Sequence, residues 1–258
     1  MKRIIASMMM LCLTAAYAQE KTDTTLMQEV TVSNSKDNRA LRDQPLASTT
    51  IDTHEIISKG MHSMTDLASY VPNLFIPAYG SRQTTAIYLR GVGSRINTPA
   101  VGLYVDDILW ADKSAYDFDI SDVQSIDILR GPQSTLYGRN AMGGLIRIST
   151  KNPLDYQGTD ISLQGATYGT ARASATHYHR ISSRLGFSGG FGYAHSEGYF
   201  TNHYNDKKAD RDDEANARFR LVAKPTDVVR LDFHANYEYS RQGAYPYMLE
   251  NASQKDYF

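Results

Sequence analysis

Two contrasting halves of the sequence predict an α+β domain followed by the antiparallel β-strands of an incomplete transmembrane β-barrel. Residues 45–152 mix helix-capping residues, short apolar runs and glycine turns, which is typical of a small α+β unit. After Pro153 the helix signals end, and apolar and polar residues alternate strictly over 229–239. At about 3.3 Å per residue and a strand tilt near 40°, such a run presents an apolar face roughly 25 Å tall, the height of a lipid band.

The first eighteen residues predict export. Lys2 and Arg3 precede an apolar stretch over 4–16, and Ala16-Tyr17-Ala18 forms a cleavage site, so residues 1–18 are predicted to be a signal peptide. The only cysteine, Cys12, lies inside this segment. The mature chain is therefore expected to have no disulfide and no thiolate metal site.

Residues 19–44 are polar and are predicted to be a linker that contains one short alternating run near Val30. In the α+β unit, Asp52 with Glu55 and Ser63 with Asp66 have the spacing of helix caps. We therefore expect short helices over 53–59 and from 63 to about 70. We expect strands over 86–90, 101–105, 125–130 and 145–150, separated by glycine turns.

The C-terminal half predicts five strands. They are expected near 160–168, 171–179, 184–195, 215–221 and 229–239, with a long polar loop over 196–213 and a tight turn over 224–227. In a membrane barrel the short turns would be periplasmic and the long loop extracellular. A soluble β-sandwich would show the same alternation, although the export signal favours the barrel.

The composition excludes some functions. The net charge is −1, from 27 basic and 28 acidic residues, so the sequence lacks the basic footprint of a nucleic-acid-binding protein. No apolar run reaches the roughly 18 residues of a spanning helix. Asp106-Asp107 resembles a Mg²⁺-binding pair, but a strand ending in a turn is the simpler interpretation. His177 and His179 are too few to ligate a metal, and no nucleophile–base motif is visible, so we predict no enzyme, no cofactor and no metal site.

Three segments resemble the plug domain of TonB-dependent outer-membrane receptors. They are LRGVGS over 89–94, VGLYVDDI over 101–108 and the long run VQSIDILRGPQSTLYGRNAMGGLIRIST over 123–150. The resemblance implies that 45–152 form the plug and that 153–258 form the first strands of the barrel wall. The segment Glu29, Val30, Thr31, Val32 and Ser33 is similar to the TonB box of this family, with a plain linker as the alternative.

The resemblance also implies the function and the partners. A receptor of this kind lies in the outer membrane, with its plug and N-terminus facing the periplasm. It binds a scarce nutrient chelate outside, and TonB pulls the box to open the plug. An iron–siderophore is the expected ligand by family frequency, with haem, cobalamin and glycans left open. The predicted partners are TonB, outer-membrane lipid and the chelate, with no nucleic acid.

Site residues follow from the same resemblance. Ligand contacts are expected at the plug apices, at Tyr79, Arg82, Gln83, Arg95, Asn97, Trp110 and Lys113. Aromatic faces beside guanidinium and amide groups suit an anionic or aromatic chelate, although polar loop tips are the plainer alternative. Arg90 and Arg130, each followed by glycine, are expected to form ion pairs with barrel glutamates, with a solvated surface position as the alternative.

The length raises one further expectation. Barrels of this family have about 22 strands, whereas the residues after Asn152 suffice for about five at roughly ten residues each. An open sheet edge in lipid is forbidden by its unpaired backbone groups. The sequence therefore predicts an N-terminal fragment or a truncated product. The rival interpretations are a secreted soluble α+β binding module and a non-functional remnant.

Overall fold

The computed structural model describes residues 47–96, 98–202 and 206–243. The predicted signal peptide, the linker with its box at 29–33, and Asn97 lie outside the described residues. Among the residues described, no helix is long and apolar enough to cross a bilayer.

The first part of the described chain is a small α+β domain around a mixed sheet. Its elements are β1 (Ala47–Asp52), α2 (Thr53–Ser58), α3 (Met64–Leu67), β2 (Leu74–Phe75), η3 (Arg82–Thr84), β3 (Tyr88–Leu89), β4 (Val92–Gly93), β5 (Val101–Val105), β6 (Ile108–Trp110), η4 (Lys113–Ala115), β7 (Val123–Arg130), α4 (Ser134–Tyr137) and β8 (Gly144–Thr150). The main sheet has the order β1-β7-β8-β5-β6, and only β5 and β8 run parallel. The core between this sheet and the two N-terminal helices includes Ile56, Leu67, Ile126, Ile128 and Ile146.

Helix caps form where the sequence predicts them. The Asp52 carboxylate accepts the Glu55 N–H at 2.8 Å and starts α2. Ser63 and Asp66 form the capping box of α3. Each cap satisfies backbone donors that have no partner within the first turn of a helix. The predicted starts of these two helices are confirmed, although the second ends at Leu67 rather than near residue 70. The strand over 101–105 is confirmed.

One prediction needs correction, and one strand was not predicted. The strand expected over 86–90 is only Tyr88–Leu89, because Arg90 and Gly91 both have positive φ, 53° and 80°, and turn the chain into β4. Conversely, β1 begins at Ala47, at the end of a polar run. It pairs with β7 over its whole length, a long-range contact that local periodicity does not reveal.

The acidic pair Asp106-Asp107 forms a hairpin turn. Both residues have positive φ, 49° and 67°, and they link the registered pair Val105 and Ile108. A two-residue loop with two positive φ values is the type I′ turn that suits right-twisted strands, and aspartate tolerates this conformation better than most residues. The pair therefore forms a turn at the end of a strand. This was a simpler interpretation of the sequence than a Mg²⁺-binding pair.

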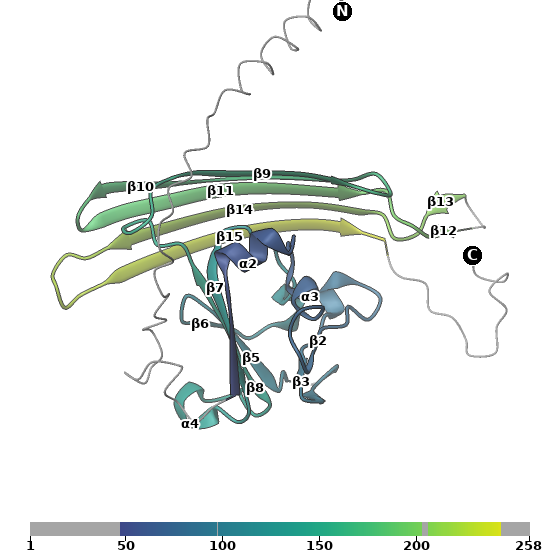
Figure 1. Ribbon diagram of the computed structural model, residues 1–258, viewed down its shortest axis with the longest axis horizontal. Helices are drawn as coiled ribbons and strands as arrows, with labels where there is room; N and C mark the ends of the chain where they lie inside the picture. Colours follow the sequence, from purple (N-terminus) through teal and green to yellow (C-terminus); the bar gives the residue numbers. More distant parts are fainter. Residues whose placement is uncertain (1–46, 97, 203–205, 244–258) are drawn as a thin grey trace, which may run out of the picture. The chain divides into compact units, whose positions relative to one another are not determined.

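The second part is an antiparallel sheet of long strands, called here the wall sheet. It comprises β9 (Gly158–Ala166), β10 (Thr170–Ser182), β11 (Leu185–Ser196), β14 (Asp212–Ala223) and β15 (Leu231–Gln242), in the order β15-β14-β11-β10-β9. The short pair β12 (Thr201–Asn202) and β13 (Lys207–Lys208) lies in the long connection before β14. Figure 1 shows the wall sheet as one curved layer with the α+β domain against one side.

The two faces of the wall sheet differ in polarity. Large apolar side chains on the outward face remain exposed: Ile161, Leu163, Phe191, Phe219, Leu231, Phe233, Tyr237 and Tyr239. On the other face Tyr178 and Val222 are buried, at 2% and 0% exposure. The predicted alternation is therefore confirmed, with the apolar positions outward and the polar positions inward.

The first testable prediction concerns Gly144, which begins β8. Its φ is +152°, and an added Cβ would overlap the Leu89 side chain and lie 2.5 Å from the carbonyl oxygen of Leu129. We expect Gly144→Ala to lower the free energy of unfolding of the α+β domain by about 2–4 kcal/mol, from overpacking and backbone strain. Urea titration of detergent-solubilised protein measures this, because the chain's one tryptophan, Trp110, packs on Phe118 in this domain.

Gly165→Ala is the matched control. Gly165 lies in β9 with no atom within 4 Å of an added Cβ. It should leave the midpoint of the tryptophan transition unchanged. Equal midpoints for both variants would contradict the packing assigned to Gly144.

Candidate functional site

The described residues present two candidate sites: a polar interface between the α+β domain and the wall sheet, and a cluster of loop tips at the predicted apices. The interface depends on arginines. Arg218, on the inward face of β14, places one nitrogen 2.7 Å from the carbonyl oxygen of Asp119 and 2.9 Å from its carboxylate. Its other terminal nitrogen pairs with Asp122. These contacts join the wall to the segment between η4 and β7.

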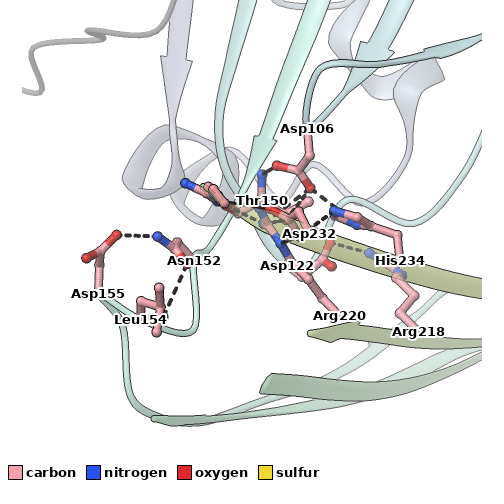
Figure 2. A network of polar contacts seen from close by, with 11 residues as sticks. Asp106, Asp122, Thr150, Asn152, Leu154, Asp155, Arg218, Arg220, Asp232 and His234 are labelled. Carbon is pink, nitrogen blue, oxygen red and sulfur yellow. Dashed lines mark hydrogen bonds and ion pairs between the residues drawn. The ribbon is translucent and has the colours of Figure 1, made fainter. Parts of the chain in front are cut away.

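Arg220, two residues along β14, joins the wall to the ends of β5 and β8. Its guanidinium binds the Asp232 carboxylate through two nitrogens, at 3.0 and 2.8 Å. Its remaining nitrogen donates to the Thr150 hydroxyl at 2.6 Å and lies 3.3 Å from Asp106. Figure 2 shows these side chains converging, with His234 beside them. The Asp106 side chain also accepts the backbone N–H of Thr150 at 2.9 Å, so the turn itself is fixed at the interface.

A third arginine comes from the opposite side. Arg82, in η3 of the α+β domain, is only 7% exposed. Its terminal nitrogens lie 2.6 Å from Glu214 of β14 and 2.6 Å from Glu238 of β15. Its Nε lies 3.7 Å from Asp117 of its own domain. One guanidinium thus faces three carboxylates, and its pKa is raised because these carboxylates outweigh the effect of burial.

Burial also changes the acids of the α+β domain. Loss of solvation raises the pKa of Asp117 to about 6, although Arg82 opposes the shift. It raises the pKa of Asp122 as well, against the opposing charge of Arg218. Such shifts show that these carboxylates lie in a region of low solvation, where a guanidinium partner strongly affects the energy of the ionised form.

The apical cluster brings together three of the predicted ligand contacts. The Arg95 guanidinium lies over the Tyr79 ring, 4.5 Å from its centroid. The Lys113 ammonium donates to the carbonyl oxygens of Ser94 and Arg95, at 3.3 and 2.8 Å, and ties η4 to that loop. The Tyr79 hydroxyl donates to that of Tyr88 at 3.0 Å. Arg95 is exposed, so its charge is accessible to an anionic molecule.

Other predicted site residues lie elsewhere. Gln83 is exposed in η3, next to the cluster, and Asn97 lies outside the described residues. The Trp110 ring packs on Phe118 with centroids 4.7 Å apart and adds to the core. Arg82 is buried among carboxylates of its own domain and of the wall. Arg82 does not fit the predicted ligand contact, because its side chain is not available at the surface, whereas the contact of the half-buried Trp110 stays a prediction.

The ion pairs predicted between Arg90 and Arg130 and glutamates of the barrel remain predictions. Arg90 is exposed in its turn, and Arg130 donates to the Thr49 hydroxyl at 2.6 Å. Burial and the nearby Arg90 charge lower the pKa of Arg130, and its Nε has no hydrogen-bond partner among the described residues. A carboxylate from another part of a barrel would stabilise two neighbouring cations of this kind.

Sequence reasoning missed Arg218 and Arg220. Both occupy polar positions of an alternating strand, so the pattern assigned them to the inward face without a partner. Within the described ranges, no group of three potential ligands forms a metal site. His177 and His179 stack against each other, with ring centroids 6.1 Å apart, on the outward face.

Comparison with known proteins identifies the domain. The family model described as "TonB-dependent Receptor Plug Domain" matches residues 40–145. The α+β domain is therefore similar to a TonB-dependent receptor plug. The α+β domain described above is called the plug from here on. The predicted resemblance and the fold class, a plug followed by antiparallel strands, are confirmed.

Curated relatives are receptors. The Pesticin receptor of Yersinia enterocolitica is 36% identical over 140 residues, which cover 54% of this chain and 20% of the relative. The Catecholate siderophore receptor Fiu of Escherichia coli K12 is 28% identical over 161 residues, which cover 57% of this chain and 20% of the relative. The chain thus spans about a fifth of the length of these relatives. Because they are receptors rather than enzymes, they agree with the prediction of no enzyme.

A solved structure extends the likeness into the wall sheet. The ferric yersiniabactin uptake receptor FyuA from Yersinia pestis matches with a TM-score of 0.68 and 27% identity. The match covers 76% of this chain and 32% of that one. Because 76% exceeds the share of the plug alone, strands of the wall are included. Members of this receptor family are outer-membrane proteins.

The second prediction concerns pH. The folded-state pKa of Asp117, about 6, lies above its ordinary value of 3.8, so between these values only the folded state holds the proton. The contribution of Asp117 to folding stability is therefore largest below the lower value and falls as pH rises through this window. We expect Asp117→Asn to remove that part of the pH slope in urea titrations followed by Trp110 fluorescence.

Asp112→Asn is the control for this experiment. Hydrogen bonding to the Ser114 N–H lowers the pKa of Asp112, so this exposed carboxylate is already ionised throughout the window. Its variant should keep the wild-type slope between about pH 4 and 6. An unchanged slope in Asp117→Asn would show that Asp117 titrates in the ordinary range.

Proposed function

We propose that this chain supplies the plug and the first wall strands of a TonB-dependent receptor that takes up an anionic iron chelate across the outer membrane. The observation that carries the proposal is the two-faced wall sheet. Its inward face meets the plug through Arg218 and Arg220, and its outward face exposes a band of large apolar side chains.

The exposed band argues against the soluble binding module. Leu231 and Phe233 are 59% and 58% exposed, and Tyr237 is 66% exposed. A contiguous apolar face of this kind is a liability in water but the expected surface of a strand against lipid. Membrane fractionation separates the two possibilities, because an integral wall resists alkaline extraction and a soluble module does not.

The apical cluster supports an anionic, aryl-containing ligand. An exposed guanidinium stacked on a tyrosine offers both a positive charge and an aromatic face. Two of the matched proteins fit this class in their names, which refer to catecholate siderophores and to ferric yersiniabactin. We infer that the ligand is a ferric siderophore with aromatic iron-binding groups.

Energy coupling is proposed to act through Glu29 to Ser33. An extended segment of alternating valine and threonine can add as a strand to the sheet edge of TonB. The segment precedes β1, which among the described strands is an edge strand of the plug sheet and pairs with β7 alone. Force on the box would therefore reach the plug through β1.

The third prediction tests this coupling. Proline at position 30 removes a backbone donor and cannot continue a strand ladder. In a receptor-deficient Gram-negative host expressing the full coding sequence, we expect Val30→Pro to abolish energy-dependent uptake of ⁵⁵Fe-labelled catecholate or phenolate siderophores. Binding to the cells should be unchanged. The control variant Thr22→Pro, which lies outside the box, should take up iron normally. Normal uptake by Val30→Pro would show that the segment 29–33 does not couple energy to uptake.

The fourth prediction tests the apical contact. Arg95→Gln keeps a polar side chain and removes the charge over Tyr79. We expect the dissociation constant of the same ferric siderophores to rise about tenfold or more, since a charge-assisted contact contributes about 1.5–3 kcal/mol. Arg172→Gln, an exposed arginine in β10, is the control and should bind as wild type. Equal affinities for Arg95→Gln and wild type would remove Arg95 from the ligand site.

A further inference from the structure

Arg82 is a plug residue whose side chain contacts two neighbouring wall strands at once. Its terminal nitrogens lie 2.6 Å from Glu214 and 2.6 Å from Glu238. Its backbone N–H donates to the Gln242 side chain of β15 at 2.8 Å. The side chain and the main chain of one residue are therefore both attached to the wall.

The segment that carries Arg82 also carries Tyr79 of the apical cluster. The Thr84 hydroxyl lies 2.5 Å from the carbonyl oxygen of Ala78 and 3.0 Å from that of Tyr79, which closes the loop on itself. The Thr85 hydroxyl donates to the Arg82 carbonyl at 2.6 Å. A displacement of Arg82 therefore moves the Tyr79 ring and the guanidinium stacked on it.

The charges at this point make the contact strongly dependent on Arg82. Three carboxylates, those of Asp117, Glu214 and Glu238, face one guanidinium that is only 7% exposed. Removing the cation leaves three carboxylates facing one another with no positive charge between them, two of which, those of Asp117 and Glu214, are largely buried, and this is strongly destabilising. The Arg82 contact is thus well suited to hold the plug against the wall in a closed state and to release it in one step.

We propose that Arg82 is a clamp between the ligand-binding loop of the plug and the barrel wall, and that its ion pairs with Glu214 and Glu238 must open before ligand passes. The inference rests on the proposed function. The clamp is distinct from the predicted pairs of Arg90 and Arg130, because it binds strands β14 and β15 and lies in the segment of the apical cluster. Arg82 positions the ligand-binding loop and does not contact ligand, since its guanidinium is paired with Glu214 and Glu238 of the wall.

A reversible cross-link tests whether the clamp must open. The one cysteine of the given sequence, Cys12, lies in the predicted signal peptide, so engineered thiols are the only thiols in residues 19–258. In the full-length receptor in cells, Arg82→Cys with Glu238→Cys is joined by a short bis-methanethiosulfonate reagent, which forms a reducible disulfide with each thiol and releases methanesulfinate. We expect ⁵⁵Fe–catecholate binding to persist, uptake to fall about tenfold or more relative to the same protein after reduction, and reduction to restore it.

The control cross-link joins two positions within the wall. Ala217→Cys and Tyr237→Cys are directly opposite in the register of β14 and β15, on the outward face. This cross-link should leave uptake unchanged. Uptake by the cross-linked 82–238 protein equal to that of the control would overturn the proposal.

A ligand-free measurement keeps the clamp testable if the proposed function fails. Wild-type cells that take up none of the labelled siderophores would contradict the proposed function but not the attachment of Arg82 to the wall. Arg82→Glu is expected to lower the urea midpoint reported by Trp110, and Glu238→Arg in the same chain is expected to restore part of it. Additive losses in the double variant would show that the two side chains do not interact, and would overturn the clamp.

Discussion

The structure depends on the pairing of buried arginines with carboxylates across the surface between the plug and the wall. Arg218 and Arg220 extend from the wall to acids of the plug, and Arg82 extends from the plug to acids of the wall. Each surface therefore holds charges that the other must neutralise. Because an unpaired buried charge is far more costly than a paired one, the contact favours this one docking position over shifted ones.

The same pairing explains how two well-packed parts can still separate. The plug keeps its own apolar core, in which residues such as Leu67, Ile126 and Ile146 are fully buried. The wall turns its large apolar side chains outward. Their common surface is largely polar, and polar groups recover hydration when it opens, whereas an apolar interface would expose surface that water disfavours. This suits the proposed receptor, in which the plug blocks a passage at rest and yields under load.

Local sequence patterns predicted much of the fold, and their failures have a common physical cause. Helix caps and strand alternation depend on residues a few positions apart, so Asp52, Ser63 and the 229–239 run were interpreted correctly. Strand β1 and the position of Arg82 depend on distant partners; the backbone of Arg82 bonds to Gln242, 160 residues along the chain. A polar loop containing arginine looks the same in sequence whether it faces solvent or a wall.

The inward face of β14 shows why the interface could not be predicted from the sequence alone. Alternation places Glu214, Asn216, Arg218 and Arg220 on one side of the strand, and a water-filled channel would accept the same residues. What distinguishes a docking surface is the order of the charges. Glu214 lies beside the cation Arg82, while Arg218 and Arg220 lie beside the plug acids Asp122 and Asp106. The acid therefore lies at one end of the strand and the arginines further along, and the plug presents the opposite order of charge. A plug shifted along β14 by two inward positions would bring Arg82 beside Arg218 in one direction, or Asp122 beside Glu214 in the other. This charge order therefore favours one docking register.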